Sequence, residues 1–286
     1  MSGPRSLVLL FVASIVAASG HAAAQAPPSD DPDAKDAAGD GGRWCAPELA
    51  ALEGEVCAKV PSREADGPRT LVIFLHGVIQ PDSGWQWAQQ RAAARAAATH
   101  GFSAIMPRGR RGRGPAGMED WWTWPNGVAA QAENEVAILG EWARAKAALE
   151  EKSGKPFERV WIFGFSNGAY YATSLALRGR LSSKDEGVHV DGFAAFAGGS
   201  GGAHLERAAK ASALRTPLFV AWGGKDKAHR DQVELARMLK RLRWPTASEG
   251  APKAGHVMTD HAVASAVRFL DGAKIAPRPP ARRRDP

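Results

Sequence analysis

Cysteine is scarce in this 286-residue chain, which contains only Cys45 and Cys57. Neither lies in a motif that would make it a nucleophile, so thiol chemistry is not expected. The pair could remain as buried free thiols. An even count in an exported chain favours a disulfide that closes a small loop instead. We therefore predict a Cys45–Cys57 bridge with a structural role.

The apolar run at residues 7–19 is too short to span a bilayer of ~30 Å. Arg5 precedes the run and Ala22–Ala24 follow it, an arrangement typical of a signal peptide cleaved near Ala24. No cysteine follows closely, so a lipid anchor is unsupported. We predict that residues 1–24 are a signal peptide and that the mature protein is secreted or periplasmic, without membrane attachment.

Acidic residues are fewer than basic ones, 30 against 37, and the formal net charge is +7. The segment 274–286 holds five basic residues and one acidic residue, so much of the excess lies at the end of the chain. We predict a basic disordered tail at residues 273–286 and no nucleic-acid partner. Residues 25–43 are rich in Pro, Gly, Ala and Asp, and we predict that they form a disordered linker. Its aspartates do not form a calcium loop, because Lys35 stands where an oxygen ligand is required, and no metal is expected.

Residues 44–272 alternate between short apolar runs and longer amphipathic segments, with no internal repeat. Buried strands are expected at 71–75, 102–106, 160–163, 192–196 and 218–222, and helices at 89–99, 131–149, from about 167, through 235–242 and at 260–270. This alternation predicts a single α/β domain with a mostly parallel sheet and helices on both faces. Ligands bind beyond the carboxyl ends of such strands, which directs attention to the residues that follow each one.

Ser166 is the candidate nucleophile. It follows the strand at 160–163 in the sequence Gly164-Phe165-Ser166-Asn167-Gly168, which fits G-x-S-x-G, and a helical segment comes directly after it. In such a turn the serine is raised into the cleft, and the flanking glycines let strand and helix approach closely. The alternative is a Gly/Ser turn that merely begins a helix.

A serine hydroxyl needs a base, and the base needs a group that orients it. Asp226 follows the strand at 218–222, and His256 lies in a glycine-flanked loop before the final helix, so both are expected at the same edge of the sheet. Asp231 and His261 are rival candidates, but both are expected inside helices. We predict Asp226 and His256 as the acid and the base.

Backbone amides are expected to bind the oxyanion of a tetrahedral intermediate. The amide of Asn167 is one candidate. The amide of Val78, in the loop after the strand at 71–75, is the other, because Gly77 allows the backbone to turn toward the cleft. His76 is predicted to brace this loop.

These motifs resemble the α/β-hydrolase superfamily: Leu75-His76-Gly77, Gly164-Phe165-Ser166-Asn167-Gly168-Ala169, Gly223-x-x-Asp226 and Gly255-His256. The G-F-S-N-G-A form is similar to secreted esterases of the polyhydroxybutyrate-depolymerase and feruloyl-esterase type. The resemblance implies a carboxylic-ester hydrolase that works through an acyl-enzyme without a cofactor. The glycine-rich segment 198–202 departs from this pattern, and a flexible wall or hinge is expected there. The alternative of a dinucleotide fingerprint at 199–204 lacks its final glycine.

Aromatic and basic residues gather near the predicted cleft and suggest a substrate pocket, for which the candidates are Trp85, Trp121, Trp122, Trp124 and Arg110. A solvated basic loop packed down by the tryptophans is the alternative, and whether residues 107–126 form a lid stays open. We predict a serine carboxylic-ester hydrolase that acts on small-molecule or polymeric esters. A serine peptidase or amidase, and a non-catalytic binding protein on a hydrolase scaffold, are the alternatives. The oligomeric state is not predicted.

Overall fold

The computed structural model describes residues 43–114, 116–182 and 187–278. The predicted signal peptide and all but the last residue of the predicted linker lie outside these ranges. Within them, no helix combines the length and the apolar character that crossing a membrane requires.

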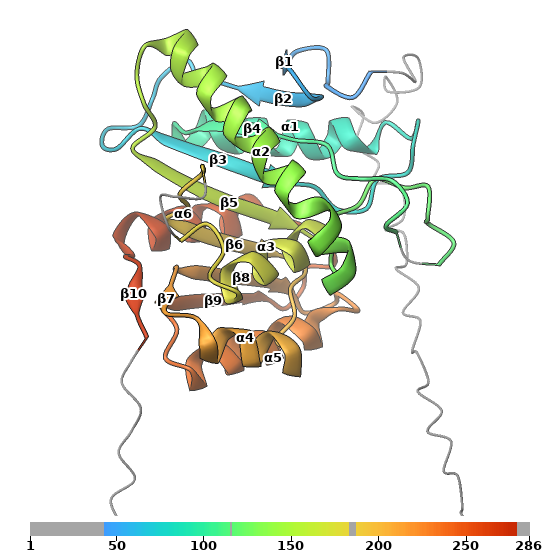
Figure 1. Cartoon of the computed structure of the whole chain (residues 1–286), viewed down its shortest axis with the longest axis vertical. Helices are drawn as coiled ribbons and strands as arrows, with labels where there is room; N and C mark the ends of the chain where they lie inside the picture. Colours follow the sequence, from blue (N-terminus) through green and yellow to red (C-terminus); the bar gives the residue numbers. More distant parts are fainter. Residues whose placement is uncertain (1–42, 115, 183–186, 279–286) are drawn as a thin grey trace, which may run out of the picture.

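An eight-stranded sheet in the order β1-β2-β4-β3-β5-β6-β8-β9 forms the centre of the molecule (Figure 1). Its strands are β1 (Ala50–Leu52), β2 (Val56–Lys59), β3 (Thr70–Leu75), β4 (Ser103–Met106), β5 (Arg159–Phe165), β6 (Gly192–Phe196), β8 (Leu218–Gly223) and β9 (Thr246–Ala251). β1 and β2 pair in antiparallel fashion, and every pair from β4 to β9 is parallel. The predicted fold class is confirmed.

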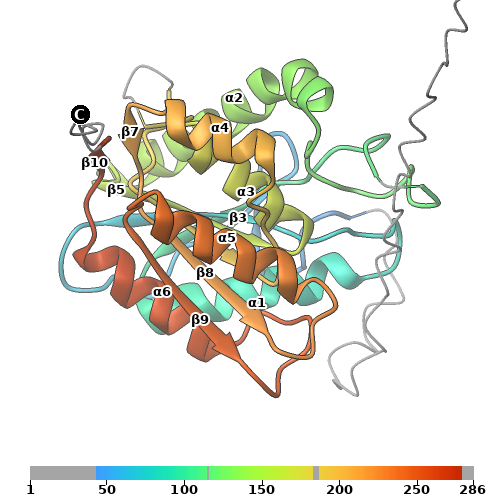
Figure 2. The same cartoon turned by 90° about the horizontal axis from the view of Figure 1, so that it is seen from below.

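Six helices among the described residues cover the sheet: α1 (Trp85–His100), α2 (Val128–Ser153), α3 (Asn167–Leu177), α4 (Ala203–Ala211), α5 (His229–Arg241) and α6 (Asp260–Gly272). Figure 2 shows α1 and α6 on the opposite side of the sheet from α2, α3 and α4. Successive strand residues point to opposite faces, so Val72 and Phe74 pack with α1 and α6, while Leu71, Ile73 and Leu75 pack with α2, α3 and α5. Two cores on the two faces explain why β3 is apolar at every one of these positions.

The order of the strands marks where a ligand would bind. The chain runs from β3 to β4 on one side and then crosses to β5 on the other side of β3. The connections leave the carboxyl ends of β3 and β5 in opposite directions, which creates a crevice at the switch point. The loop after β3 and the turn after β5 meet there.

Three expectations about the elements need correction. β9 was not predicted, because its sequence TASEGA has no apolar run. α4 begins at Ala203, directly after the glycine-rich segment, where only a flexible wall or hinge was expected. The predicted disordered tail is ordered at its start, because β10 (Ala276–Pro277) pairs with β7 (Leu214–Arg215). The ordered domain therefore extends past residue 272.

The predicted disulfide between Cys45 and Cys57 is present, with a Cα–Cα distance of 5.3 Å. It joins the segment before β1 to β2, and both cysteines are buried. The bridge thus fixes the start of the domain to the sheet.

Candidate active site

Ser166 occupies a sharp turn between β5 and α3. Its backbone has φ 53° and ψ −116°, a left-handed conformation that a non-glycine residue adopts only where the surroundings impose it. A methyl group at Gly168 would overlap the carbonyl oxygens of Leu75 and His76, and one at Gly164 would overlap the carbonyl of Gly168. The two flanking glycines therefore let β3, β5 and α3 approach closely enough to hold the serine in this turn.

The structure brings Ser166, His256 and Asp226 together. Ser166 Oγ lies 2.8 Å from His256 Nε2, and His256 Nδ1 lies 2.9 Å from Asp226 Oδ2. The other carboxylate oxygen of Asp226 accepts a hydrogen bond of 2.9 Å from the amide of Ala228. The three side chains come from loops after β5, β9 and β8, at the carboxyl edge of the sheet. This is the geometry of a nucleophile, a base and a group that orients the base.

Asp226 is held as a carboxylate. Burial raises the pKa of Asp226, but the hydrogen bonds from His256 and Ala228, together with the positive charge that His256 can carry, lower it further, so that the net pKa lies below its ordinary value. An ionised Asp226 favours the tautomer with a proton on His256 Nδ1 and leaves Nε2 free to accept a proton from Ser166.

The rival residues have other partners. The carboxylate of Asp231 accepts a hydrogen bond of 2.8 Å from the Tyr170 hydroxyl. His261 Nε2 lies 3.1 Å from Glu249, and the His261 side chain is 74% exposed. Neither rival is placed to serve Ser166.

The backbone amides of Val78 and Asn167, which the sequence predicts to bind the oxyanion, have no hydrogen-bond acceptor among the described residues. A methyl group at Gly77 would lie 3.2 Å from Ser166 Cβ, so the loop after β3 passes directly beside the serine. The amide of Gly77 itself donates to Gln89 Oε1 at 2.7 Å. Gln89 was not predicted as a site residue. It is buried and holds the loop of Gly77, but in the sequence it is only a glutamine in an alanine-rich helix.

His76 braces this loop, as predicted. Its Nδ1 donates to the carbonyl of Gly77, and its Nε2 accepts a hydrogen bond of 2.9 Å from the amide of Gly109. The residue is 4% exposed, and burial lowers the pKa of His76 to about 4. His76 is therefore neutral near pH 7 and acts as a fixed donor and acceptor.

Trp124 is a core residue and does not line a substrate pocket, which corrects its assignment from sequence. It is 1% exposed and stacks on Tyr171. Its indole N–H donates to the carbonyl of His76 at 3.0 Å, and its amide donates to Asn167 Oδ1 at 2.7 Å. One tryptophan thus connects the loop of Val78 to the residue after the nucleophile.

The segment between β4 and α2 is tied to the site at several points. Ile79 and Trp122 exchange two backbone hydrogen bonds of 3.0 and 2.9 Å, and Arg110 pairs with Thr123 in the same way. Together with the contacts of Trp124, these bonds argue against a lid that swings freely.

The other pocket candidates have different surroundings. Arg110 lies 2.6 Å from Glu141, so its charge is compensated inside the protein, and its proposed contact with substrate does not fit. Trp122 lies under the guanidinium of Arg108, at 4.0 Å. Trp85, in the first turn of α1, is 41% exposed, and Trp121 is partly exposed. Of the five candidates, Trp85 and Trp121 are the ones whose side chains are at least partly exposed and neither paired with a carboxylate nor covered by an arginine.

The glycine-rich segment 198–202 packs closely against its neighbours, so close packing explains its glycines without a hinge. A methyl group at Gly198 would overlap the carbonyl of Ser166, and one at Gly199, which has φ 105°, would lie 2.8 Å from Thr173 Oγ1. These glycines let the segment after β6 pass against α3 behind the nucleophile.

Known protein structures resemble this chain in fold. An acyl-protein thioesterase 2 from Zea mays superposes with a TM-score of 0.56 at 15% identity, covering 76% of this chain and 99% of that one. The esterase Est22 gives 0.54 at 14% identity over 76% of each chain. Esterase B from Lactobacillus rhamnosis, inhibited by a tributyrin phosphonate, gives 0.53 at 14% identity over 80% and 83%.

The chain has the α/β-hydrolase fold. At these identities the likeness extends to the fold and no further. No protein-family model matches the sequence, and no curated protein does either. The narrower likeness to polyhydroxybutyrate depolymerases and feruloyl esterases finds no support in these comparisons.

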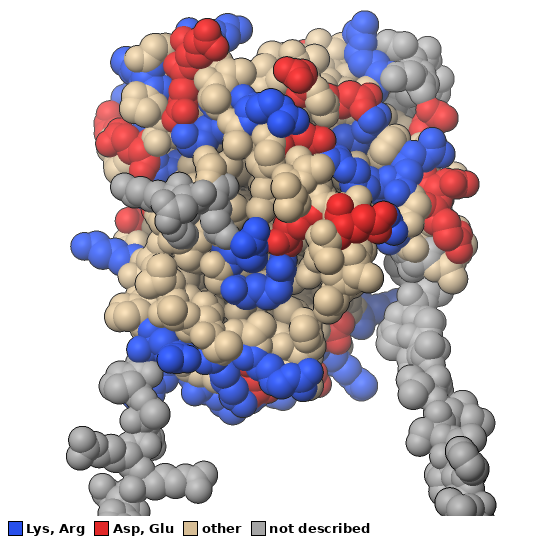
Figure 3. All heavy atoms as spheres, viewed as in Figure 1, with Lys and Arg blue, Asp and Glu red and all other residues tan. Residues whose placement is uncertain are grey.

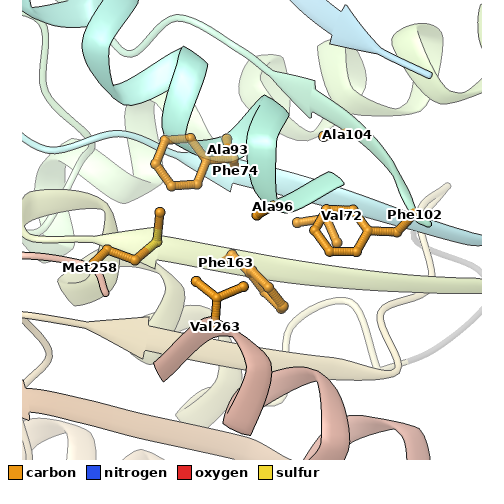
Figure 4. A pocket seen from close by; sticks show the side chains of 9 residues that line it. All are labelled: Val72, Phe74, Ala93, Ala96, Phe102, Ala104, Phe163, Met258 and Val263. Atoms are coloured by element: carbon orange, nitrogen blue, oxygen red, sulfur yellow. The ribbon is translucent and has the colours of Figure 1, made fainter. Parts of the chain in front are cut away.

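A small apolar pocket lies between α1, α6 and the sheet (Figure 4). Its lining residues are Val72, Phe74, Ala93, Ala96, Phe102, Ala104, Phe163, Met258 and Val263. None of them carries a group that could donate, accept or transfer a proton. Among the residues that the structure describes, no cluster of three or more His, Cys, Asp or Glu side chains could hold a metal ion.

Proposed function

We propose that this protein is a serine carboxylic-ester hydrolase. The observation that carries the proposal is the continuous chain of hydrogen bonds from Ser166 Oγ through His256 to Asp226, at 2.8 and 2.9 Å. The left-handed backbone of Ser166 supports the proposal, because such conformations occur often at active sites.

The arrangement supports a two-step reaction. Ser166 Oγ attacks the ester carbonyl while His256 Nε2 takes its proton, and the oxyanion is held by the amides of Val78 and Asn167. His256 then gives the proton to the departing alcohol, which leaves an acyl-enzyme. Water attacks this ester with His256 again as the base, and the acid is released as Ser166 regains its proton. Asp226 orients the imidazole and stabilises its charge throughout.

The chain offers matched controls for testing this proposal with a short-chain 4-nitrophenyl ester. Ser166→Ala and His256→Ala should each lower kcat by at least about 1000-fold, and Asp226→Asn by about 10,000-fold. His261→Ala and Asp231→Asn remove the same chemical groups nearby and should change kcat less than about threefold. Full turnover by Ser166→Ala, or loss of turnover in His261→Ala but not in His256→Ala, would refute the assignment.

The same three side chains can cleave esters and amides, so the geometry alone does not separate an esterase from a peptidase or amidase. A comparison of matched ester and amide substrates does. We expect the 4-nitrophenyl ester to be hydrolysed and the 4-nitroanilide of the same acid to be left intact. Turnover of the anilide at a comparable rate would favour the peptidase or amidase alternative. Retention of both compounds without turnover would favour a binding protein.

We further propose that the protein is exported. The signal-like N-terminus and the buried Cys45–Cys57 disulfide both agree with an oxidising compartment, because such bonds are rare where thiols are kept reduced.

A further inference from the structure

Besides the C-terminal segment 274–286, positive charge is concentrated in one further part of the chain. Residues 203–243 contain ten Lys and Arg against four Asp and Glu, a net charge of +6, whereas the whole chain carries +7. Figure 3 shows Lys and Arg gathered along its lower edge, over α4 and α5. The remaining 245 residues are therefore close to neutral in sum.

Four basic residues, three of them from this region, lie close in the chain to Asp226 and His256. Lys225 and Lys227 follow β8, Arg230 lies in the first turn of α5, and Lys253 follows β9. All four are exposed, and we call them the cationic rim. The two loops touch, because the amide of Lys225 donates to the carbonyl of Ala254 at 2.9 Å.

The cationic rim lies next to two members of the triad along the chain. Lys225 and Lys227 are the direct neighbours of Asp226, and Lys253 precedes His256 by three residues. Asp226 forms no ion pair with the rim, because its side chain is buried and its two carboxylate oxygens are bonded to His256 and to the amide of Ala228.

The arginines on the other side of the site differ from the rim in one respect. Arg108 pairs with Glu55, Arg110 with Glu141 and Arg113 with Glu133. No carboxylate of the described residues forms an ion pair with any member of the cationic rim.

The carboxylates near the rim keep their charges but do not pair with it. Asp231 accepts a hydrogen bond from the Tyr170 hydroxyl, and Glu249 lies beside His261. Glu234, on α5, and Asp260, in the first turn of α6, are exposed. Because none of these carboxylates holds a lysine of the rim in an ion pair, the ammonium groups can bind an anionic group of a substrate.

We propose that the ester substrate carries an anionic group, such as a carboxylate, which Lys225, Lys227 and Lys253 bind beside the scissile bond. This inference rests on the proposed hydrolase function and names its substrate class. Lysine ammonium groups on flexible stems can follow an anion without a fixed geometry, and charge-assisted hydrogen bonds to a carboxylate are stronger than neutral ones. The unpaired cations would therefore raise both the rate of encounter and the affinity for an acidic ester.

The test compares neutral and anionic esters on the same enzyme. One matched pair differs on the acyl side, 4-nitrophenyl butyrate against the 4-nitrophenyl monoester of succinic acid. A second pair differs on the alcohol side, phenyl acetate against 3-acetoxybenzoate. The readout is the ratio of kcat/KM for the anionic ester to that for the neutral ester. Intrinsic reactivity and any change in His256 cancel when this ratio is compared between variants.

The rim variant combines Lys225→Gln, Lys227→Gln and Lys253→Gln. The control combines Arg207→Gln, Arg237→Gln and Lys240→Gln, which removes the same three charges from exposed positions on α4 and the far half of α5. We expect the rim variant to lower the ratio about tenfold in at least one pair at low ionic strength, and the control to change it less than about twofold. The difference should vanish in 1 M salt, where the Debye length is about 3 Å.

An unchanged ratio in both pairs, or an equal fall in the rim variant and the control, would overturn the inference while leaving the hydrolase proposal intact. If the wild-type protein hydrolyses none of the four esters, the hydrolase proposal itself fails. The two results are therefore distinguishable from one data set.

Discussion

Acidification should destabilise this protein through His76, and the structure sets the size of the effect. The pKa of His76 falls from its ordinary value of 6.5 to about 4 in the folded protein, because the ring is buried. Between these two values the unfolded chain binds a proton that the folded chain does not, so the free energy of unfolding falls as the pH drops from about 6.5 toward 4. At about 1.4 kcal/mol per pKa unit, the whole change amounts to about 3 kcal/mol, most of it between pH 7 and pH 4.5.

Urea unfolding at pH 7 and pH 4.5, for the wild type and His76→Gln, measures this contribution. The variant is expected to be less stable at pH 7, because Gln cannot keep both ring contacts, to Gly77 and Gly109. The relevant quantity is the loss of stability between the two pH values, which should be about 2 to 3 kcal/mol smaller in the variant. Equal losses in the two proteins would show that His76 is already protonated in the folded protein or is accessible to water, and would contradict a buried, neutral imidazole.

Two further predictions concern packing and export. Gly168→Ala should lower the free energy of unfolding by at least about 2 kcal/mol and abolish turnover, because the new methyl group overlaps the carbonyl oxygens of Leu75 and His76 and must push α3 away from β3. In the control Gly272→Ala, the new methyl group meets no atom within 4 Å, so Tm and activity should not change. Protein exported by a bacterial host should begin at Gln25 in N-terminal sequencing and carry the Cys45–Cys57 bridge, and reducing that bridge should cost about 3 kcal/mol in unfolding free energy; a retained N-terminus or free thiols would contradict export.

Much of the candidate site could be predicted from sequence because its parts obey local rules. Ser166 lies in a motif with a steric cause. Asp226 follows a recognisable strand, and His256 lies in a glycine-flanked loop before the last helix, so both could be placed at the carboxyl edge of the sheet. Parallel strands bring their carboxyl ends to one edge, so positions far apart in the chain could be combined without knowing any contact. His256 was found in this way although β9, the strand before it, was not recognised. That strand has few apolar residues and is identified only by its parallel pairing with β8.

The errors arose where the outcome depends on distant partners. Trp124 is buried because Trp142 and Tyr171 lie beside it, and nothing in the local sequence separates it from Trp121. Arg110 is compensated by Glu141, which comes from the next helix. Residues 276–277 are ordered because β7 offers them an edge. Composition and periodicity do not carry information of this kind.

Covalent labelling shows without any assumption about the substrate whether Ser166 is the nucleophile. Full-length protein should be treated with a fluorophosphonate probe, digested, and mapped by peptide mass. We predict one modified residue, Ser166, with labelling lost in Ser166→Ala and strongly slowed in His256→Ala, because Ser166 Oγ lies 2.8 Å from an imidazole that Asp226 orients. Label on a different serine, or equal labelling of the Ser166→Ala variant, would contradict it.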